Sequence, residues 1–214
     1  MSDIFQEIDE DLRRDRFTQL WKIYRYPIMA GMAAVIVGTA GMVGWREYQD
    51  RRNAAQADAF LRAMDQAQRN DADAAKAALG QLARDGGAGY ATLARLQQAA
   101  LLAKGGDNAG AVRVYDEIAA DGRVEQGLRD LASILAVQHL VDSADPGELM
   151  KRLEPLARDK NPWRHSAMEM QALAAKRAGD TAKAKEIYTK LADDLSAPQG
   201  LRARAAEMLA ILGG

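Results

Sequence analysis

A segment that occurs twice decides the fold of this chain. It reads GDNAGAVRVYDEIAAD at residues 106–121 and GDTAKAKEIYTKLADD at residues 179–194. Both copies hold Gly-Asp, then Ala four residues after the aspartate, Tyr at eight, an aliphatic residue at eleven, Ala at twelve and Asp at fourteen. The copies lie 73 residues apart, which is roughly twice the length of a two-helix repeat. The chain therefore contains an internal repeat.

Two fainter copies occur at the same interval. They are headed by Asp71 and Asp145, and the matching offsets hold Ala75, Leu79, Leu82, Ala83 and Asp85 in the first copy, and Leu149, Leu153, Leu156, Ala157 and Asp159 in the second. The four head aspartates are spaced 36, 38 and 35 residues apart. This spacing is close to the tetratricopeptide period of about 34 residues, and it predicts a stack of helix–turn–helix units.

Each shared residue type has a physical role in such a helix pair. Glycine ends the first helix, because it adopts left-handed backbone angles freely. Aspartate accepts hydrogen bonds from the first amides of the second helix. Alanine lets two helix axes approach, and tyrosine lies on the face that enters the core. The structural repeat residues predicted in this way are Gly106, Asp107, Ala111, Tyr115, Gly179, Asp180, Ala184 and Tyr188.

The pattern predicts an all-α solenoid of about four helix pairs and a capping helix. Alanine is abundant, β-branched residues are sparse after residue 46, and no alternating strand pattern occurs. Pro198 is expected to open the capping helix, which runs to about Leu212, and Pro155 is expected to kink its helix. The predicted pairs are 46–69 with 72–84, 88–104 with 107–120, 124–141 with 146–158, and 162–178 with 181–194.

A stretch without charged residues, 26–45, lies between Arg25 and Arg46. As a helix it is about 30 Å long, which matches the hydrocarbon core of a bilayer. Aromatic residues that suit the membrane–water interface flank it on both sides. We therefore interpret residues 26–45 as an uncleaved transmembrane helix. A cleaved signal peptide is the alternative, because small residues follow the apolar run at 38–40.

Small residues recur along this stretch. Ala30, Ala34 and Gly38 follow one another at a spacing of four residues, and Gly41 extends the series. These four are the candidate transmembrane packing residues. Two interpretations stay open: they seat a second helix closely, or they reflect how common small residues are in membrane-spanning helices.

Basic residues predict the orientation. Five arginines and lysines closely precede the stretch and three arginines follow it, which favours a cytoplasmic N-terminus. The predicted domains are a cytoplasmic arm (1–25), a transmembrane helix (26–45) and a helical domain (46–214), which is periplasmic if the host is a Gram-negative bacterium. The absence of cysteine is compatible with that oxidising compartment.

Charge and motif content argue against several functions. The chain holds 24 basic and 24 acidic residues after residue 25, so no basic field exists for nucleic acid. The two histidines, His139 and His165, are expected to be ordinary helix residues. The segment 86–89 follows no predicted strand and precedes no Lys-Ser/Thr pair, so it is interpreted as a turn rather than a phosphate loop. We expect no catalytic residue, no metal and no cofactor.

Several segments, taken in their order along the chain, resemble a known family. They are residues 5–15 (FQEIDEDLRRD), 20–24 (LWKIY), 26–45, 161–164 (NPWR) and 200–205 (GLRARA). The chain resembles the single-span, tetratricopeptide-like membrane proteins that include an ancillary subunit of the bacterial Sec translocon. The resemblance implies an inner-membrane location and association with the Sec translocon and with a membrane-anchored periplasmic chaperone.

One position departs from ordinary tetratricopeptide repeats. These repeats usually carry a large aromatic residue twelve residues before the head aspartate, where this chain has Arg95 and Met168. The groove is therefore expected to differ in shape from theirs.

The leading hypothesis is a non-catalytic, membrane-anchored interaction protein that links the translocon to periplasmic chaperones. The alternative is a scaffold or assembly factor for another membrane complex, such as one of cell division, outer-membrane biogenesis or respiration. The residues themselves do not separate the two, and they leave open whether the chain forms a homo-oligomer.

Overall fold

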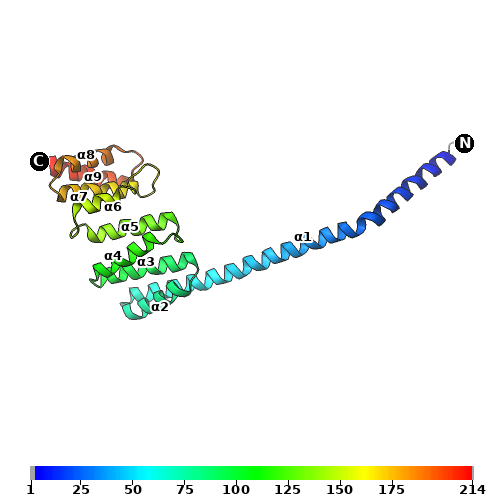
Figure 1. The fold of residues 1–214 in the computed structure, drawn as a ribbon, viewed down its shortest axis with the longest axis horizontal. Helices are drawn as coiled ribbons and strands as arrows, with labels where there is room; N and C mark the ends of the chain where they lie inside the picture. Colours follow the sequence, from blue (N-terminus) through cyan, green and yellow to red (C-terminus); the bar gives the residue numbers. More distant parts are fainter. Residues whose placement is uncertain (1–2, 214) are drawn as a thin grey trace. The chain divides into compact units, whose positions relative to one another are not determined.

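The computed structural model describes the backbone of residues 3–213 and the side chains of Trp21, of residues 25–27 and of residues 29–213. Most side chains of the predicted arm, 1–25, therefore lie outside the described residues. Every regular element in the described part is an α-helix, which confirms the all-α prediction (Figure 1). The helices are α1 (Asp3–Gln68), α2 (Ala72–Asp85), α3 (Ala88–Lys104), α4 (Asn108–Ala120), α5 (Gln126–Leu140), α6 (Pro146–Leu153), α7 (Arg164–Arg177), α8 (Thr181–Asp193) and α9 (Gln199–Gly213).

The chain divides into two compact units, Met1–Ala54 and Ala55–Gly214. The first unit holds most of α1, whose helix continues through Pro27. By length and composition, α1 is the one helix of the described residues that could cross a membrane. Large apolar side chains of its stretch 29–48, such as Val35, Val37 and Trp45, are more than half exposed. The division into arm, transmembrane helix and helical domain stays a prediction.

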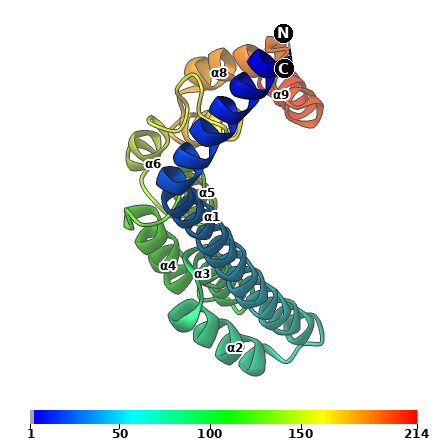
Figure 2. The ribbon, with the colours of Figure 1, turned by 90° about the vertical axis from the view of Figure 1, so that its right-hand side faces the viewer.

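The second unit is a stack in which each helix packs against its neighbours in the chain. Figures 1 and 2 show α2 to α9 following one another side by side along a curved course. Four clusters of buried apolar residues form the core, each shared by three consecutive helices: the end of α1 with α2 and α3, then α3–α5, α5–α7 and α7–α9. A core assembled from neighbouring helices is typical of a repeat solenoid.

Aspartate begins the second helix of each pair. Asp71, Asp107, Asp145 and Asp180 directly precede α2, α4, α6 and α8. Each carboxylate accepts a hydrogen bond from the amide three residues later, over 2.8–3.2 Å. A cap of this kind stabilises a helix by about 1 kcal/mol. Because these caps recur at regular intervals along the sequence, the helix pairs also recur at regular intervals.

A left-handed residue precedes three of the four caps. Gly106 has φ +89° and Gly179 has φ +81°, and Asn70 holds the same position with φ +64°. Asparagine tolerates this conformation better than most residues that carry a side chain. The left-handed conformation turns the chain back, so that the amide of the following aspartate bonds to a carbonyl five residues earlier. Asp107 bonds in this way to Leu102 over 2.9 Å.

The predicted helix 146–158 with a kink at Pro155 is wrong. α6 ends at Leu153, and residues 154–157 form turns. Pro155 has no amide hydrogen to extend the helical ladder. The amides of Leu156 and Ala157 both bond to the carbonyl of Leu153 over 3.0 Å, which closes the turn. The helices from α2 to α9 other than α6 lie within two residues of their predicted bounds.

Candidate functional site

Of the structural repeat residues, the two alanines and two tyrosines lie in the interior of the stack, whereas Gly106, Asp107, Gly179 and Asp180 are exposed at the turns. Ala111 and Ala184 are 0 % exposed, and Tyr115 and Tyr188 are 2 % and 1 % exposed. These side chains hold α4 and α8 against the preceding helices. They are therefore closed to a partner, and contact sites must be sought elsewhere.

Burial also suppresses ionisation of the two tyrosines. It raises the pKa of Tyr115, and it raises the pKa of Tyr188 to about 12 with a further contribution from the negative charge of Glu169. The Tyr115 ring stacks on the ring of His139, with centroids 5.9 Å apart and planes 7° from parallel. These aromatic groups contribute packing.

The four candidate packing residues of α1 are all exposed. Ala30, Ala34, Gly38 and Gly41 lie within one side of the helix by their spacing. A side-chain carbon added at Gly38 or Gly41 would meet no atom within 4 Å. This strip leaves room for a close approach, and its role in packing stays a prediction.

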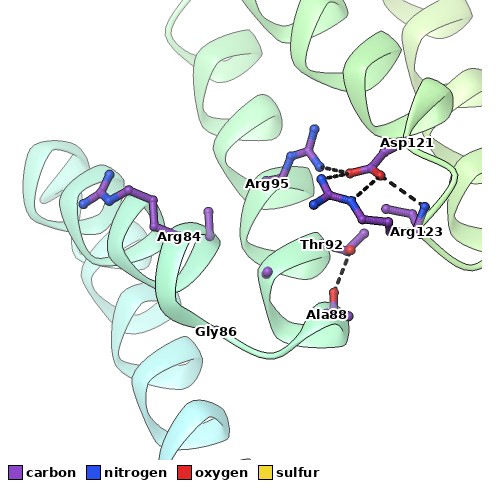
Figure 3. Close-up of a pocket in the computed structure, with 10 residues that line it drawn as sticks. Arg84, Gly86, Ala88, Thr92, Arg95, Asp121 and Arg123 are labelled. Carbon is purple, nitrogen blue, oxygen red and sulfur yellow. Dashed lines mark hydrogen bonds and ion pairs between the residues drawn. The ribbon is translucent and has the colours of Figure 1, made fainter.

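Asp121 and Asp194 hold equivalent positions, fourteen residues after Asp107 and Asp180. Asp121 accepts hydrogen bonds from Arg95 of α3 over 3.3 Å and from Arg123 over 2.9 Å (Figure 3). The hydrogen bonds from Arg123, the charge of its guanidinium group and the hydrogen bond from Arg95 hold the pKa of Asp121 well below its usual range. Asp121 therefore joins α3 to the loop between α4 and α5.

A cavity of about 230 Å³ lies beside this cluster, between the end of α2, the first turns of α3 and the α4–α5 loop. Small residues at the start of α3, among them Ala88 and Ala91, line it. In Figure 3 the guanidinium groups of Arg95 and Arg123 turn toward Asp121, whereas Arg84 points away from it. The central charges of the cavity are thus paired within the chain, which makes the cluster a joint between helices.

Asp194 gathers a histidine and a serine, an arrangement that superficially suggests catalysis. Its Oδ2 accepts from Arg164 and lies 3.0 Å from Nε2 of His165, and its Oδ1 accepts from Oγ of Ser196 over 2.6 Å. Ser196 Oγ also lies 3.4 Å from the same ring nitrogen, Nε2. A nucleophile and an orienting carboxylate must contact opposite nitrogens of the imidazole to relay a proton. This cluster therefore ties α7 to the loop after α8, and it lowers the pKa of Asp194.

Sequence reasoning missed a buried polar network between α5 and the loop before α7. Asp130 is 7 % exposed and accepts hydrogen bonds from Gln126 over 2.6 Å and from Asn161 over 2.8 Å. Trp163 donates from Nε1 to the carbonyl of Gly127 over 3.1 Å. The sequence signal for this network is Asp130 itself, a charged residue on the helical face that carries Ile134 and Val137.

The described residues contain no group of three or more His, Asp or Glu side chains that could hold a metal ion. What they show instead is a ladder of capped helix pairs with a shared residue pattern. The sequence model of the tetratricopeptide repeat-like domain matches residues 18–208. The chain belongs to this family. Neither a curated protein nor a solved structure matches it.

Membership of the tetratricopeptide repeat-like family bears on function at a general level. Such domains are typically non-catalytic modules that bind other proteins through the extended surfaces of their stacks. The geometry of the Asp121 and Asp194 clusters agrees with this, because both connect helices.

Proposed function

We propose that this tetratricopeptide repeat-like protein is a non-catalytic interaction protein held in the bacterial inner membrane by residues 26–45. Its N-terminus is cytoplasmic and its repeat stack is periplasmic. It serves as an accessory subunit of the Sec translocon and links the translocon to a membrane-anchored periplasmic chaperone.

The observation that carries this proposal is a family repeat stack on the same chain as an exposed apolar helix. The stack supplies a protein-binding surface of the kind that this family uses. The apolar part of α1 is of the length and composition that a bilayer crossing requires. The order of the sequence segments described above favours the translocon over other membrane complexes.

Site-specific photo-crosslinking in native membranes tests the proposal. A photoreactive residue at Ala34 or Gly38, on the strip of small residues, is expected to capture a translocon or chaperone component. Matched probes at Met32 and Ile36, about half a turn away on α1, are expected to give weaker products. Products from a division, outer-membrane assembly or respiratory complex, with none from the translocon or chaperone, would contradict the proposal.

Co-purification provides an independent check. The full-length protein, extracted in a mild detergent, is expected to bring down components of the Sec translocon. The same extraction with Gly38→Leu tests whether the strip of small residues contributes, because leucine would hold a neighbouring helix away.

A further inference from the structure

A groove of about 380 Å³ lies between α6 and α8 over the surface of α7. Gln171 of α7 contributes to it, the half-buried Met150 of α6 supplies apolar surface, and the edge of Ile187 of α8, which is 8 % exposed, reaches it. Three lysines surround this surface: Lys151 on α6, and Lys183 and Lys190 on α8. The groove belongs entirely to the repeat stack and is separate from the Asp121 cavity.

The neighbouring interface shows how such a groove is closed. Between α4 and α6, Arg152 donates from both terminal nitrogens to the carboxylate of Asp116, over 2.8 and 3.2 Å. Asp116 stands nine residues after its head Asp107, and Arg152 stands seven residues after its head Asp145. A two-point arginine–carboxylate pair holds these helices in a defined geometry.

Between α6 and α8, the position equivalent to Asp116 is again acidic, but the position equivalent to Arg152 is not an arginine. The position nine after Asp145 is Glu154, and the position seven after Asp180 is Ile187. Isoleucine cannot donate a hydrogen bond, so no bridge forms across the helices. Glu154 instead lies 3.8 Å from Arg158 in the turn that follows α6.

The early end of α6 widens the gap. α6 has eight residues, whereas α4 and α8 have 13 each. Because Pro155 stops the helix, α6 lacks the last turns that α4 and α8 have. Two independent features of the sequence, Pro155 and Ile187, therefore produce one opening.

The charges of the groove favour an acidic ligand. Lys190 bonds to Glu186 over 2.6 Å. The pKa of Glu186 is lowered, chiefly by that bond and in part by the charge of Lys183. Within residues 29–213, the side-chain ammonium groups of Lys151 and Lys183 form no hydrogen bond or ion pair. The groove is lined by three lysines and by two glutamates, Glu154 and Glu186. Glu186 bonds to Lys190 and Glu154 pairs with Arg158, so Lys151 and Lys183, one on each wall, lack a direct carboxylate partner.

We propose that this groove binds an acidic, amphipathic segment of a partner protein. An apolar side chain of the partner packs against Met150 and Ile187, and its carboxylates bond to Lys151 and Lys183. Grooves between helices commonly take an amphipathic helix in this manner, with flanking charges setting its orientation. The inference rests on the proposed interaction role and names the chemistry of the partner at one surface.

Peptide binding to the full chain in phosphatidylcholine nanodiscs tests the inference. The probe is a fluorescent peptide of about twelve residues, made of glutamate with leucines at helical spacing. A peptide with lysine in place of every glutamate is the control. Anisotropy is expected to show saturable binding of the acidic peptide alone, weakening between about 0.1 M and about 0.5 M salt because the ions screen the pairs.

Charge reversal locates the site. Lys151→Glu with Lys183→Glu is expected to weaken binding about tenfold or more, since two pairs become repulsive. The matched control is Lys76→Glu with Lys104→Glu, which reverses two exposed lysines of α2 and α3 and is expected to leave the affinity unchanged. Equal loss in both double variants, or none in the first, would overturn the assignment.

A closing substitution tests the cause of the groove. Ile187→Arg supplies the donor that Glu154 lacks, and it is expected to abolish peptide binding at a cost in stability, because Ile187 is 8 % exposed and belongs to the α7–α9 core. If this variant fails to fold, the lysine double variant alone decides. Binding of the acidic and basic peptides with equal affinity, or of neither, would show that the groove has no such specificity. The crosslinking probes described above are placed on α1 and do not depend on the groove. Crosslinks to the translocon or chaperone without peptide binding would therefore refute the binding role of the groove and still support the proposed function.

Discussion

Asn161 donates a hydrogen bond from Nδ2 to Oδ2 of Asp130 over 2.8 Å, and this bond joins the loop before α7 to the buried face of α5. The carbonyl oxygen of the same Asn161 side chain accepts from the amide of Trp163 over 2.8 Å. The Asn161 side chain therefore fixes both the carboxylate of Asp130 and the turn that leads into α7.

We expect Asn161→Ala to destabilise the repeat stack by about 1–3 kcal/mol, because a buried carboxylate oxygen would lose its partner. The melting temperature should fall by roughly 2–4 °C for each kcal/mol in a domain of this size. Asn108→Ala removes an exposed asparagine and serves as the control. Equal melts for the two variants would show that the bond contributes nothing.

Ala111→Trp and Ala184→Trp should each loosen or unfold the stack. Both alanines are 0 % exposed, and overpacking a helix crossing costs on the order of 1–3 kcal/mol. The neighbouring variants Ala109→Trp and Ala182→Trp place the same side chain at exposed positions of α4 and α8 and should melt near the wild type. Unchanged melts at residues 111 and 184 would contradict the buried crossings.

Gly106→Ala and Gly179→Ala should each destabilise the fold by about 1–2 kcal/mol, since alanine resists left-handed angles. No atom lies within 4 Å of the added carbon at either site, so the cost is conformational. Gly122→Ala, also without near atoms and without a positive φ, is the matched control. Urea titration of all three variants measures the difference.

Acid should destabilise the stack partly through Asp121 and Asp194. Both carboxyl groups have pKa values lowered from 3.8, by bonds from Arg123 to Asp121 and from Ser196 to Asp194. A group whose pKa is lower in the folded state stabilises the fold above its unfolded pKa, and this contribution disappears as the pH falls. Urea midpoints of the wild type should therefore decrease between about pH 5 and pH 3.

Asp121→Asn combined with Asp194→Asn should flatten that decrease, while lowering stability at neutral pH. Asp142→Asn, at an exposed residue, should preserve the wild-type slope. A double variant that follows the wild-type pH profile would show that these two groups do not carry the acid sensitivity.

The proposed topology predicts the outcome of proteolysis on spheroplasts. External protease should remove the chain after about residue 46 and spare a membrane-bound N-terminal fragment. Protection of the repeat stack would reverse the orientation. Recovery of a soluble mature protein that begins after Ala40 would instead identify the apolar stretch as a cleaved leader.

The sequence by itself determined the helix pairs and, from α2 to α9 and apart from the end of α6, their limits. Caps at Asp107 and Asp180, left-handed turns at Gly106 and Gly179, and apolar spacing all act within a few residues. Such local effects repeat wherever the pattern repeats, so they can be read along the chain. The end of α6 was misjudged because proline either kinks or stops a helix, and the pattern alone did not distinguish these outcomes.

Only the tertiary structure decided which side chains meet across the stack. Asp121 was visible as a repeated residue, yet its partner Arg95 lies 26 residues away, and Asn161 lies 31 residues from Asp130. Pairs of this kind depend on how one helix is rotated and shifted against the next, which the packing of the whole core sets. The same long-range register set Glu154 and Ile187 in the lining of one groove between α6 and α8.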